Sequence, residues 1–152
     1  MKRKVVCLLV ACMCLLCSFG SAQQAETEKE DVQIDLDLTM FSENVVYAQV
    51  YQMMVDPKAY VGKVIRVSGL LDVFEDTQTS MVYTSCIIPD ATACCANGIE
   101  FVWAGDHPYP DAYPETGSEL TVTGRFETYM EGEYMYIHLY DADVAWADSV
   151  WR

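Results

Sequence analysis

Two separate segments of the chain, 65–71 and 120–126, share one pattern in which every second residue is apolar and the third apolar position is a glycine. The first segment reads IRVSGLL and the second reads LTVTGRF. Alternation with a period of two places the apolar set on one face of a β-strand. Glycine inside a strand, here Gly69 and Gly124, allows a bend or a close approach of another backbone, as at the corner of a barrel. The pattern therefore predicts a closed, curved β-sheet whose interior both strands face.

The first 22 residues have the layout of a secretory signal peptide. Residues 2–4 are basic, residues 5–17 form a short apolar run, and small residues follow. We therefore expect cleavage close to Gln23 and an exported mature chain, because the apolar run is short for a membrane span. An uncleaved anchor is one alternative. A lipid anchor at Cys12 is another, because the residues before it resemble a bacterial lipobox.

The mature chain is strongly acidic. Removal of the first 22 residues leaves six Lys and Arg against 23 Asp and Glu, a formal charge of −17. Nucleic-acid binding depends on basic neutralisation of phosphates, so the composition argues against a nucleic-acid partner and against an anionic membrane surface. Cationic partners, metal ions or simple solubility remain as explanations of the charge.

The pattern of the mature chain predicts an acidic flexible tether, one helix and a strand-rich domain. Residues 23–40 are polar and acidic, which is typical of a tether. Ser42 is a suitable N-cap for a helix over 43–55 whose apolar residues recur at helical spacing. The helix must end before Pro57, because the residue before a proline avoids helical geometry. The domain itself is expected to span residues 41–152.

Five strands follow the helix, at about 63–74, 81–88, 99–103, 118–129 and from 134 onward. The connection between the third and fourth strands is long and proline-rich, and connections of that length are often functional. Five strands in a hairpin-rich order with one helix predict a mainly β fold, a five-stranded barrel of the OB type with an N-terminal α-helix packed on it. A five-stranded, half-open β-sandwich is the competing architecture.

Two stretches of the sequence resemble a known group of proteins. The run from Asp56-Pro57 to Gly69 is similar to the entry of many bacterial OB-fold domains, including the anticodon-binding-like group. The run IPDATACC at 88–95, followed by GIEFV at 98–102, resembles small secreted OB-like proteins of gut bacteria and OB-like domains beside bacterial permeases, some linked to metal handling. The resemblance spans residues 44–144. It implies a fold and an export context, and it implies no chemistry.

Three cysteines of the mature chain, Cys86, Cys94 and Cys95, are an odd number for an exported protein. Adjacent cysteines do not readily bond to each other, so a disulfide from Cys86 to one of the other two is the first interpretation. The second is a zinc site, because three thiolates and the imidazole of His107 make a tetrahedral ligand set. His138 is a weaker candidate for the imidazole.

A third interpretation of the cysteines is a thiol-dependent enzyme in which His107 and Asp90 would activate a cysteine. Nothing in the spacing requires such an arrangement. Acidic surroundings also raise a thiol pKa, which opposes activation. The sequence therefore argues against catalysis.

Aromatic residues on the last strand and in the long loop form a candidate ligand surface. Exposed aromatic rings on a barrel can hold sugars, peptides or bases. Alternatively, the helix or the tether covers this surface. The candidate residues are Trp103, Tyr109, Tyr113, Tyr134, Tyr136 and Tyr140.

The sequence as a whole predicts an exported, non-catalytic binding or interaction module that acts on an unknown small ligand or protein. A zinc-binding protein that uses Cys86, Cys94, Cys95 and His107 is the alternative with a cofactor. A thiol-dependent enzyme is the third.

Overall fold

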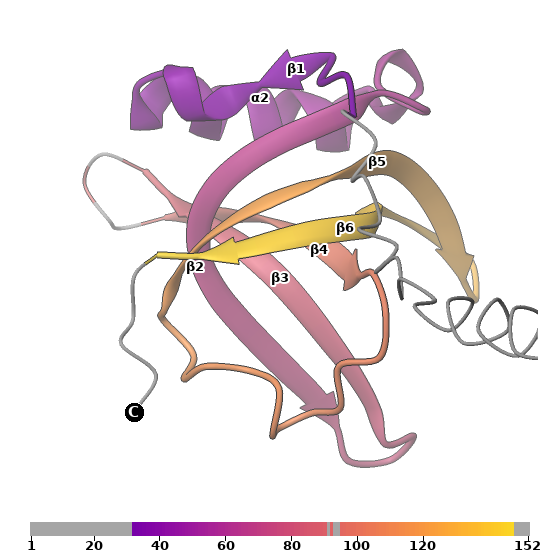
Figure 1. The fold of residues 1–152 in the computed structure, drawn as a ribbon. Coiled ribbons are helices and arrows are strands. Elements are labelled where there is room, and N and C mark those ends of the chain that lie inside the picture. The colour runs from indigo at the N-terminus through magenta and orange to yellow at the C-terminus, as the bar shows by residue number, and fades with distance from the viewer. Residues whose placement is uncertain (1–31, 91, 93–94, 148–152) are drawn as a thin grey trace, which may run out of the picture. The chain divides into compact units, whose positions relative to one another are not determined.

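The chain is mainly β in the part that the computed structural model describes, residues 32–90, 92 and 95–147 (Figure 1). The predicted signal peptide and the first half of the predicted tether, residues 23–31, lie outside the described residues. The strands are β1 Leu36–Asp37, β2 Val64–Asp76, β3 Met81–Pro89, β4 Ala96–Trp103, β5 Glu119–Glu131 and β6 Tyr134–Trp146. The helices are α2 Glu43–Val55 and two short 3-10 helices, η1 Leu38–Met40 and η2 Pro57–Ala59.

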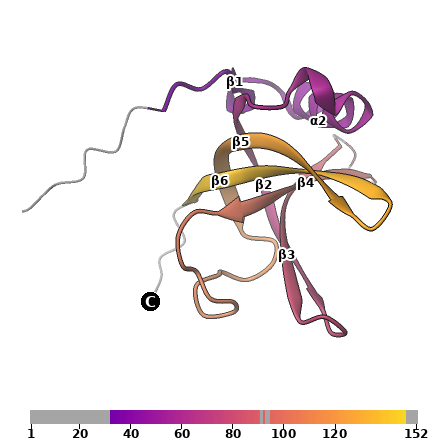
Figure 2. The ribbon, with the colours of Figure 1, turned by 90° about the vertical axis from the view of Figure 1, so that its right-hand side faces the viewer.

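The strands form one six-stranded mixed sheet whose pairings close a ring. Along the sheet the order is β1-β2-β3-β4-β6-β5, and β2 also pairs with β5. The β1–β2 and β4–β6 pairs are parallel, and the remaining pairs are antiparallel. Figures 1 and 2 show the long strands wrapping around a shared interior. The predicted mainly β fold with one α-helix is confirmed.

The two segments with the shared pattern pair with each other. In the antiparallel register of β2 and β5, Ile65 lies opposite Gly124, Val67 opposite Val122, and Gly69 opposite Leu120. The four larger side chains of these pairs are all buried in the core. Each glycine therefore faces the first apolar residue of the other segment, and both segments point into the ring as predicted.

Gly69 marks the place where β2 changes partners. The pairing of β2 with β5 ends at Leu70, which is also the first residue of β2 that pairs with β3. A Cβ atom on Gly69 would lie 2.5 Å from the carbonyl oxygen of Ile87 and 2.7 Å from Cys86 Sγ. Glycine is therefore required at this corner, because β3 passes closer to the backbone than any side chain permits.

Helix α2 lies at one end of the ring, and the connection between β4 and β5 lies at the other (Figures 1 and 2). The helix has the predicted bounds, and its residues Val46, Val50 and Met53 are buried against the sheet. Asn97 Nδ2 at the start of β4 donates a hydrogen bond to the Tyr47 carbonyl oxygen at 3.2 Å. None of the helices within the described residues has the length and apolar character needed to cross a membrane.

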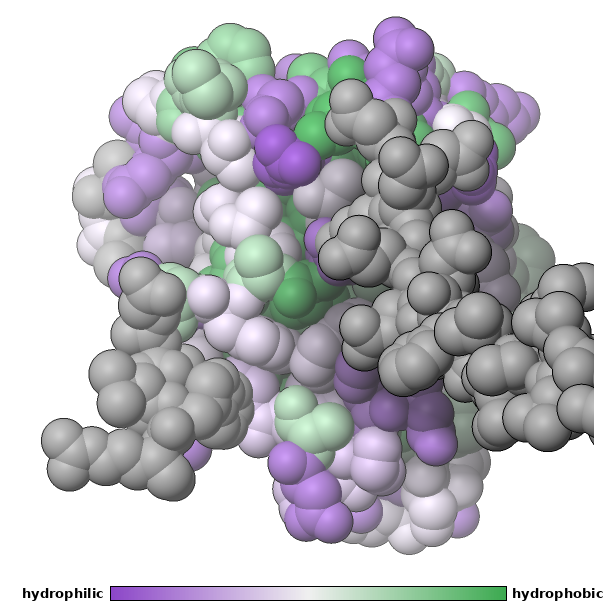
Figure 3. Space-filling view, viewed as in Figure 1, coloured by the Kyte–Doolittle hydropathy of each residue, from purple (hydrophilic) through white to green (hydrophobic). Residues whose placement is uncertain are grey.

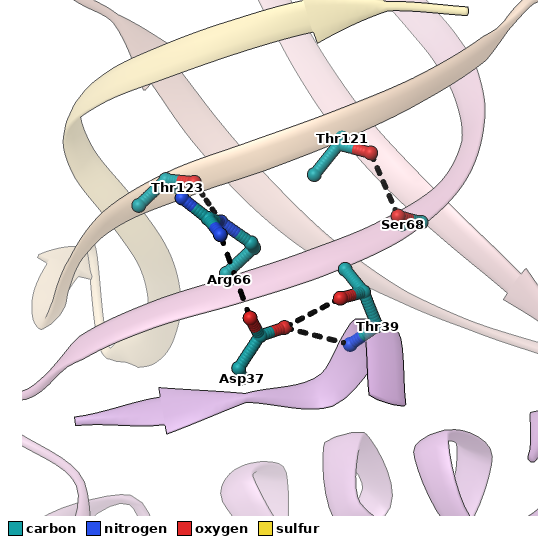
Figure 4. Close-up of polar contacts among 6 residues, drawn as sticks. All are labelled: Asp37, Thr39, Arg66, Ser68, Thr121 and Thr123. Carbon is teal, nitrogen blue, oxygen red and sulfur yellow. Dashed lines mark hydrogen bonds and ion pairs between the residues drawn. The ribbon is translucent and has the colours of Figure 1, made fainter. Parts of the chain in front are cut away.

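The end of the predicted tether is part of the sheet. Leu36 and Asp37 pair in parallel with β2, and the side chain of Leu38 is only 1% exposed. Asp37 accepts hydrogen bonds from the amide and hydroxyl of Thr39, at 3.0 and 2.6 Å, and its other carboxylate oxygen lies 3.5 Å from Arg66 Nη1 (Figure 4). The Thr39 hydroxyl, more than Arg66, holds the pKa of Asp37 below its usual value. The tether prediction thus extends too far, and the packed part of the chain begins before residue 41.

Candidate functional site

One outer face of the sheet carries a cluster of aromatic and carboxylate side chains, which we call the tyrosine face. It is formed by β3, β4, β6 and β5, which neighbour one another in that order. The alternation that sends apolar residues into the core sends these side chains outward. The tyrosine face consists of Tyr83, Glu100, Tyr129, Glu131, Tyr136, His138 and Tyr140.

Two tyrosine–glutamate hydrogen bonds connect strands that are not neighbours. The Tyr129 hydroxyl on β5 donates to Glu100 Oε2 on β4 at 2.5 Å, across the intervening strand β6. The Tyr83 hydroxyl on β3 donates to Glu131 Oε1 at the end of β5 at 2.7 Å. Each bond spans at least one intervening strand, so the two bonds tie separated strands together across the outer surface of the sheet.

The hydroxyl pKa of both tyrosines lies above its ordinary value. The hydrogen bond to Glu131 raises the pKa of Tyr83 to about 12. Burial, followed by the hydrogen bond to Glu100, raises the pKa of Tyr129. Each phenol therefore stays protonated further into the alkaline range than a free tyrosine, and its hydrogen bond fixes the position of its carboxylate.

The aromatic rings of the tyrosine face form a continuous row. Tyr129 stacks on its cross-strand neighbour Tyr136 with 5.5 Å between ring centroids, and it also contacts His138 at 4.9 Å. His138 contacts Tyr140 at 5.8 Å. Tyr136 and Tyr140 remain 39% and 47% exposed, so neither the helix nor the end of the tether covers this row within the described residues.

A cavity of about 290 Å³ opens at the rim of the tyrosine face, where the end of α2 approaches β4 and β6. Polar and apolar groups make up similar shares of its walls, and its one carboxylate is Glu100. The lining residues are Met54, Ser85, Gly98, Glu100, Met135, Tyr136 and Ile137.

The predicted aromatic surface divides into two groups. Tyr136 and Tyr140 belong to the tyrosine face, and Tyr134 stands beside them on β6 with its side chain 72% exposed. Trp103, Tyr109 and Tyr113 instead form a separate loop cluster. The parallel pairing of β4 with β6 explains the division, because it sets Glu100 beside His138 and Trp103 beside Ala142.

The loop cluster comprises Trp103, His107, Tyr109, Tyr113 and Trp146. The His107 ring stacks on Trp103 at 3.6 Å and its Nε2 lies 2.8 Å from the Ala104 carbonyl oxygen, the usual partner of a ring N–H donor. Tyr113 and Trp146 contact Trp103 edge-on, each at 5.4 Å. A cavity of about 410 Å³ lies between these residues and the ends of β3 and β4. The rings of the loop cluster mainly contact one another. No carboxylate lines this cavity.

A third hollow, of about 340 Å³, lies between η1, the start of α2 and the adjoining parts of β2, β3 and β5. Its polar lining includes Thr39, Ser68 and Thr121, and Ser68 and Thr121 already share a hydrogen bond of 2.7 Å (Figure 4). On the side of the molecule seen in Figure 3, apolar residues appear in small patches between hydrophilic ones.

The structure does not bring together the described members of the proposed zinc site. Cys86 is a free thiol buried in the core beside Gly69, Cys95 is exposed, and His107 belongs to the loop cluster. Cys94 lies outside the described residues. Within the described part of the chain, no group of three or more His, Cys, Asp or Glu side chains could hold a metal ion.

The disulfide predicted from Cys86 is not formed, because its sulfur points into the core. Burial raises the pKa of the Cys86 thiol to about 12, the opposite of the shift that an activated nucleophile requires.

Four residues of the tyrosine face were absent from the sequence prediction: Tyr83, Glu100, Tyr129 and Glu131. The positions of Tyr129 and Glu131 could have been predicted from the sequence. A two-residue turn at 132–133 fixes the register of the flanking strands, and that register sets Tyr129 opposite Tyr136. No local sequence pattern predicts that Tyr83 and Glu100 belong to this face, because their position depends on which strands pair when the ring closes.

The chain matches no protein-family model, no curated protein and no solved structure. Its function therefore has to be argued from the geometry of these three regions.

Proposed function

We propose that this chain is an exported, non-catalytic binding module of the OB type and that its ligand lies on the tyrosine face. The export component rests on the signal-peptide layout of the first 22 residues. The binding component rests on the row of rings, of which Tyr136 and Tyr140 are exposed, and on the two fixed carboxylates. The two components are independent of each other.

The order of the strands supports an OB-like barrel. An OB fold is a five-stranded, partly open Greek-key barrel that binds ligands on the face of its second and third strands, aided by the loops after the first and fourth strands. The long strands of this chain close a five-membered ring, and β3 and β4 are the second and third of them. The turns 77–80 and 132–133 are the corresponding loops. Tyr83 and Glu100 lie on these two strands, and Glu131 lies next to the second turn.

The single observation that carries the proposal is the pair of tyrosine–glutamate bonds on the exposed tyrosine face. A side chain that is already held in place loses little conformational entropy when a ligand binds. Aromatic rings with a fixed polar tip supply contact area and orientation together. The loop cluster lacks this combination, because its rings mainly contact one another.

The test is a binding screen with two matched tyrosine variants. The purified protein is applied to oligosaccharide and peptide arrays and compared with Tyr136→Ala and Tyr51→Ala. Both residues are exposed tyrosines, but Tyr51 lies on α2 and is neither part of the tyrosine face nor a lining residue of the cavity beside Glu100. We expect binding to fall by about tenfold or more in Tyr136→Ala and by less than about twofold in Tyr51→Ala.

Ligands that bind Tyr136→Ala normally but not Trp103→Ala would move the binding site to the loop cluster and contradict the proposal. Circular dichroism of each variant establishes that the fold is intact before binding is compared.

A further inference from the structure

We propose that the ligand of the tyrosine face is an extended peptide segment bearing lysine, with one lysine ammonium bound at Glu100. The inference rests on the proposed function, because it requires the tyrosine face to be the binding surface. It adds the charge, the shape and the chemical class of the ligand.

Glu100 is a carboxylate with one oxygen still open to a ligand. Its Oε2 accepts the Tyr129 hydroxyl, and none of the residues between 32 and 147 that the structure describes donates a hydrogen bond to Oε1. No described lysine or arginine forms an ion pair with Glu100 or Glu131, whereas Arg66 is paired with Asp37. A cation supplied by the ligand would therefore meet a carboxylate that no described basic side chain neutralises.

The cavity beside Glu100 fits a lysine side chain. Its volume is about 290 Å³, and Met54, Met135 and Ile137 contribute apolar walls. Lysine buries its four-carbon stem along apolar surface while the ammonium stays at a polar site. The ring of Tyr136, which also lines the cavity, adds a cation–π contact for the ammonium.

The geometry favours lysine over arginine. A guanidinium reaches its strongest interaction by bonding both oxygens of one carboxylate in parallel. Tyr129 already bonds one oxygen of Glu100, so the two-pronged arrangement would have to use the single remaining lone pair of that oxygen. An ammonium is a compact point charge and needs only the remaining oxygen.

The row of rings on β6 fits an extended chain. Tyr136, His138 and Tyr140 are spaced two residues apart, which corresponds to about 7 Å between successive side chains. An extended peptide repeats its own side chains at the same spacing, so several can contact successive rings. The acidic surface, with 23 Asp and Glu in the sequence, attracts a basic peptide over the Debye length.

The experiment is isothermal titration of the protein with four probes. The first is an acetylated, amidated heptapeptide of alternating alanine and lysine. The second and third carry arginine and glutamate at the lysine positions, and the fourth is the small diamine cadaverine. We expect the lysine peptide to bind most tightly and the glutamate peptide not to bind.

Two variants carry the test for the site. Glu100→Gln and Glu115→Gln remove the same charge, but Glu115 is exposed in the connection between β4 and β5. We expect the affinity for the lysine peptide to fall about tenfold or more in Glu100→Gln and less than about twofold in Glu115→Gln. Should Glu100→Gln fail to fold, Tyr136→Ala provides the same comparison against Tyr51→Ala.

Equal losses in Glu100→Gln and Glu115→Gln would overturn the inference, because they would indicate non-specific charge attraction. Equal affinity for cadaverine and the lysine peptide would also overturn it, in favour of a small amine. Binding of chitohexaose that depends on Tyr136, without binding of the lysine peptide, would remove this inference and leave the proposed function standing. Binding of the lysine peptide that neither Tyr136→Ala nor Glu100→Gln weakens would contradict both.

Discussion

Tyr129 on β5 donates its hydroxyl hydrogen to Glu100 on β4, and the strand that separates them in the sheet, β6, lies beneath the bond. The same tyrosine stacks on Tyr136 and contacts His138. Tyr129 is therefore the residue through which the carboxylate and the row of rings are held in one arrangement.

Tyr129→Phe removes the hydroxyl and keeps the ring. We expect the free energy of unfolding to fall by about 1 kcal/mol, at the low end for a hydrogen bond to a charged group because the site is partly exposed. Urea denaturation measures the change. Tyr134→Phe is the matched control, since Tyr134 is 72% exposed, and it should change stability by less than about 0.5 kcal/mol. Equal effects would indicate that the Tyr129 bond contributes nothing to stability.

Leu38→Ala tests the packing of the segment that resembles a tether. Its side chain is 1% exposed, so we expect a loss of about 3 kcal/mol from lost burial and the cavity left behind. Met40→Ala, two residues on and 80% exposed, should cost less than about 0.5 kcal/mol. If Leu38→Ala is as stable as Met40→Ala in thermal denaturation, the segment does not pack on the sheet in solution.

Gly69→Ala should be more destabilising than Gly98→Ala. At Gly69 the new methyl group would lie 2.5 Å from a backbone oxygen, which cannot move without displacing β3. At Gly98 it would meet the end of the Ile87 side chain at 2.9 Å, which can rotate away. We expect losses of about 3 and about 1 kcal/mol in the free energy of unfolding. The reverse order would mean that Gly69 is not the tight corner of the ring.

Stability should decline at alkaline pH because of Cys86. Burial raises the pKa of this thiol from 9.0 to about 12, so the native state keeps the proton that the unfolded state loses. Between these values the unfolded state binds fewer protons, and the free energy of unfolding falls by about 1.4 kcal/mol per pH unit from this group. The raised pKa values of Tyr83 and Tyr129 act in the same direction.

Cys86→Ala isolates the contribution of the thiol, because the two tyrosines remain. Chemical denaturation at several values between pH 9 and pH 11 should give a shallower decline for the variant than for the natural protein. Parallel declines would place the Cys86 side chain in contact with solvent and contradict its position in the core.

The helix and the five long strands could be predicted from local signals. Period-two alternation marks the strands, Pro57 ends α2, and the turn at 132–133 separates β5 from β6. β1 was missed because a two-residue strand has no period, and its segment is acidic except for a few apolar residues. The burial of Leu38 follows from a long-range pairing with β2 that no local pattern reveals.

The candidate site could be predicted only in part, for a related reason. Tyr136 and Tyr140 follow from alternation along one strand. Glu100 joins them because the third and fifth long strands pair in parallel, and that pairing depends on closure of the ring. The same pairing sets Trp103 beside Ala142, beyond the tyrosines, so the aromatic residues of the loop and those of β6 form two separate groups.

The most direct test of the tyrosine face as the ligand site is a ¹⁵N–¹H NMR titration of the protein with the alternating lysine peptide. The account predicts that the largest shift changes occur in the backbone amides of 98–101, 129–131 and 134–140, and that residues 104–113 change little. Shift changes concentrated in the loop cluster around Trp103 and Tyr113, with those of β6 unaffected, would contradict it.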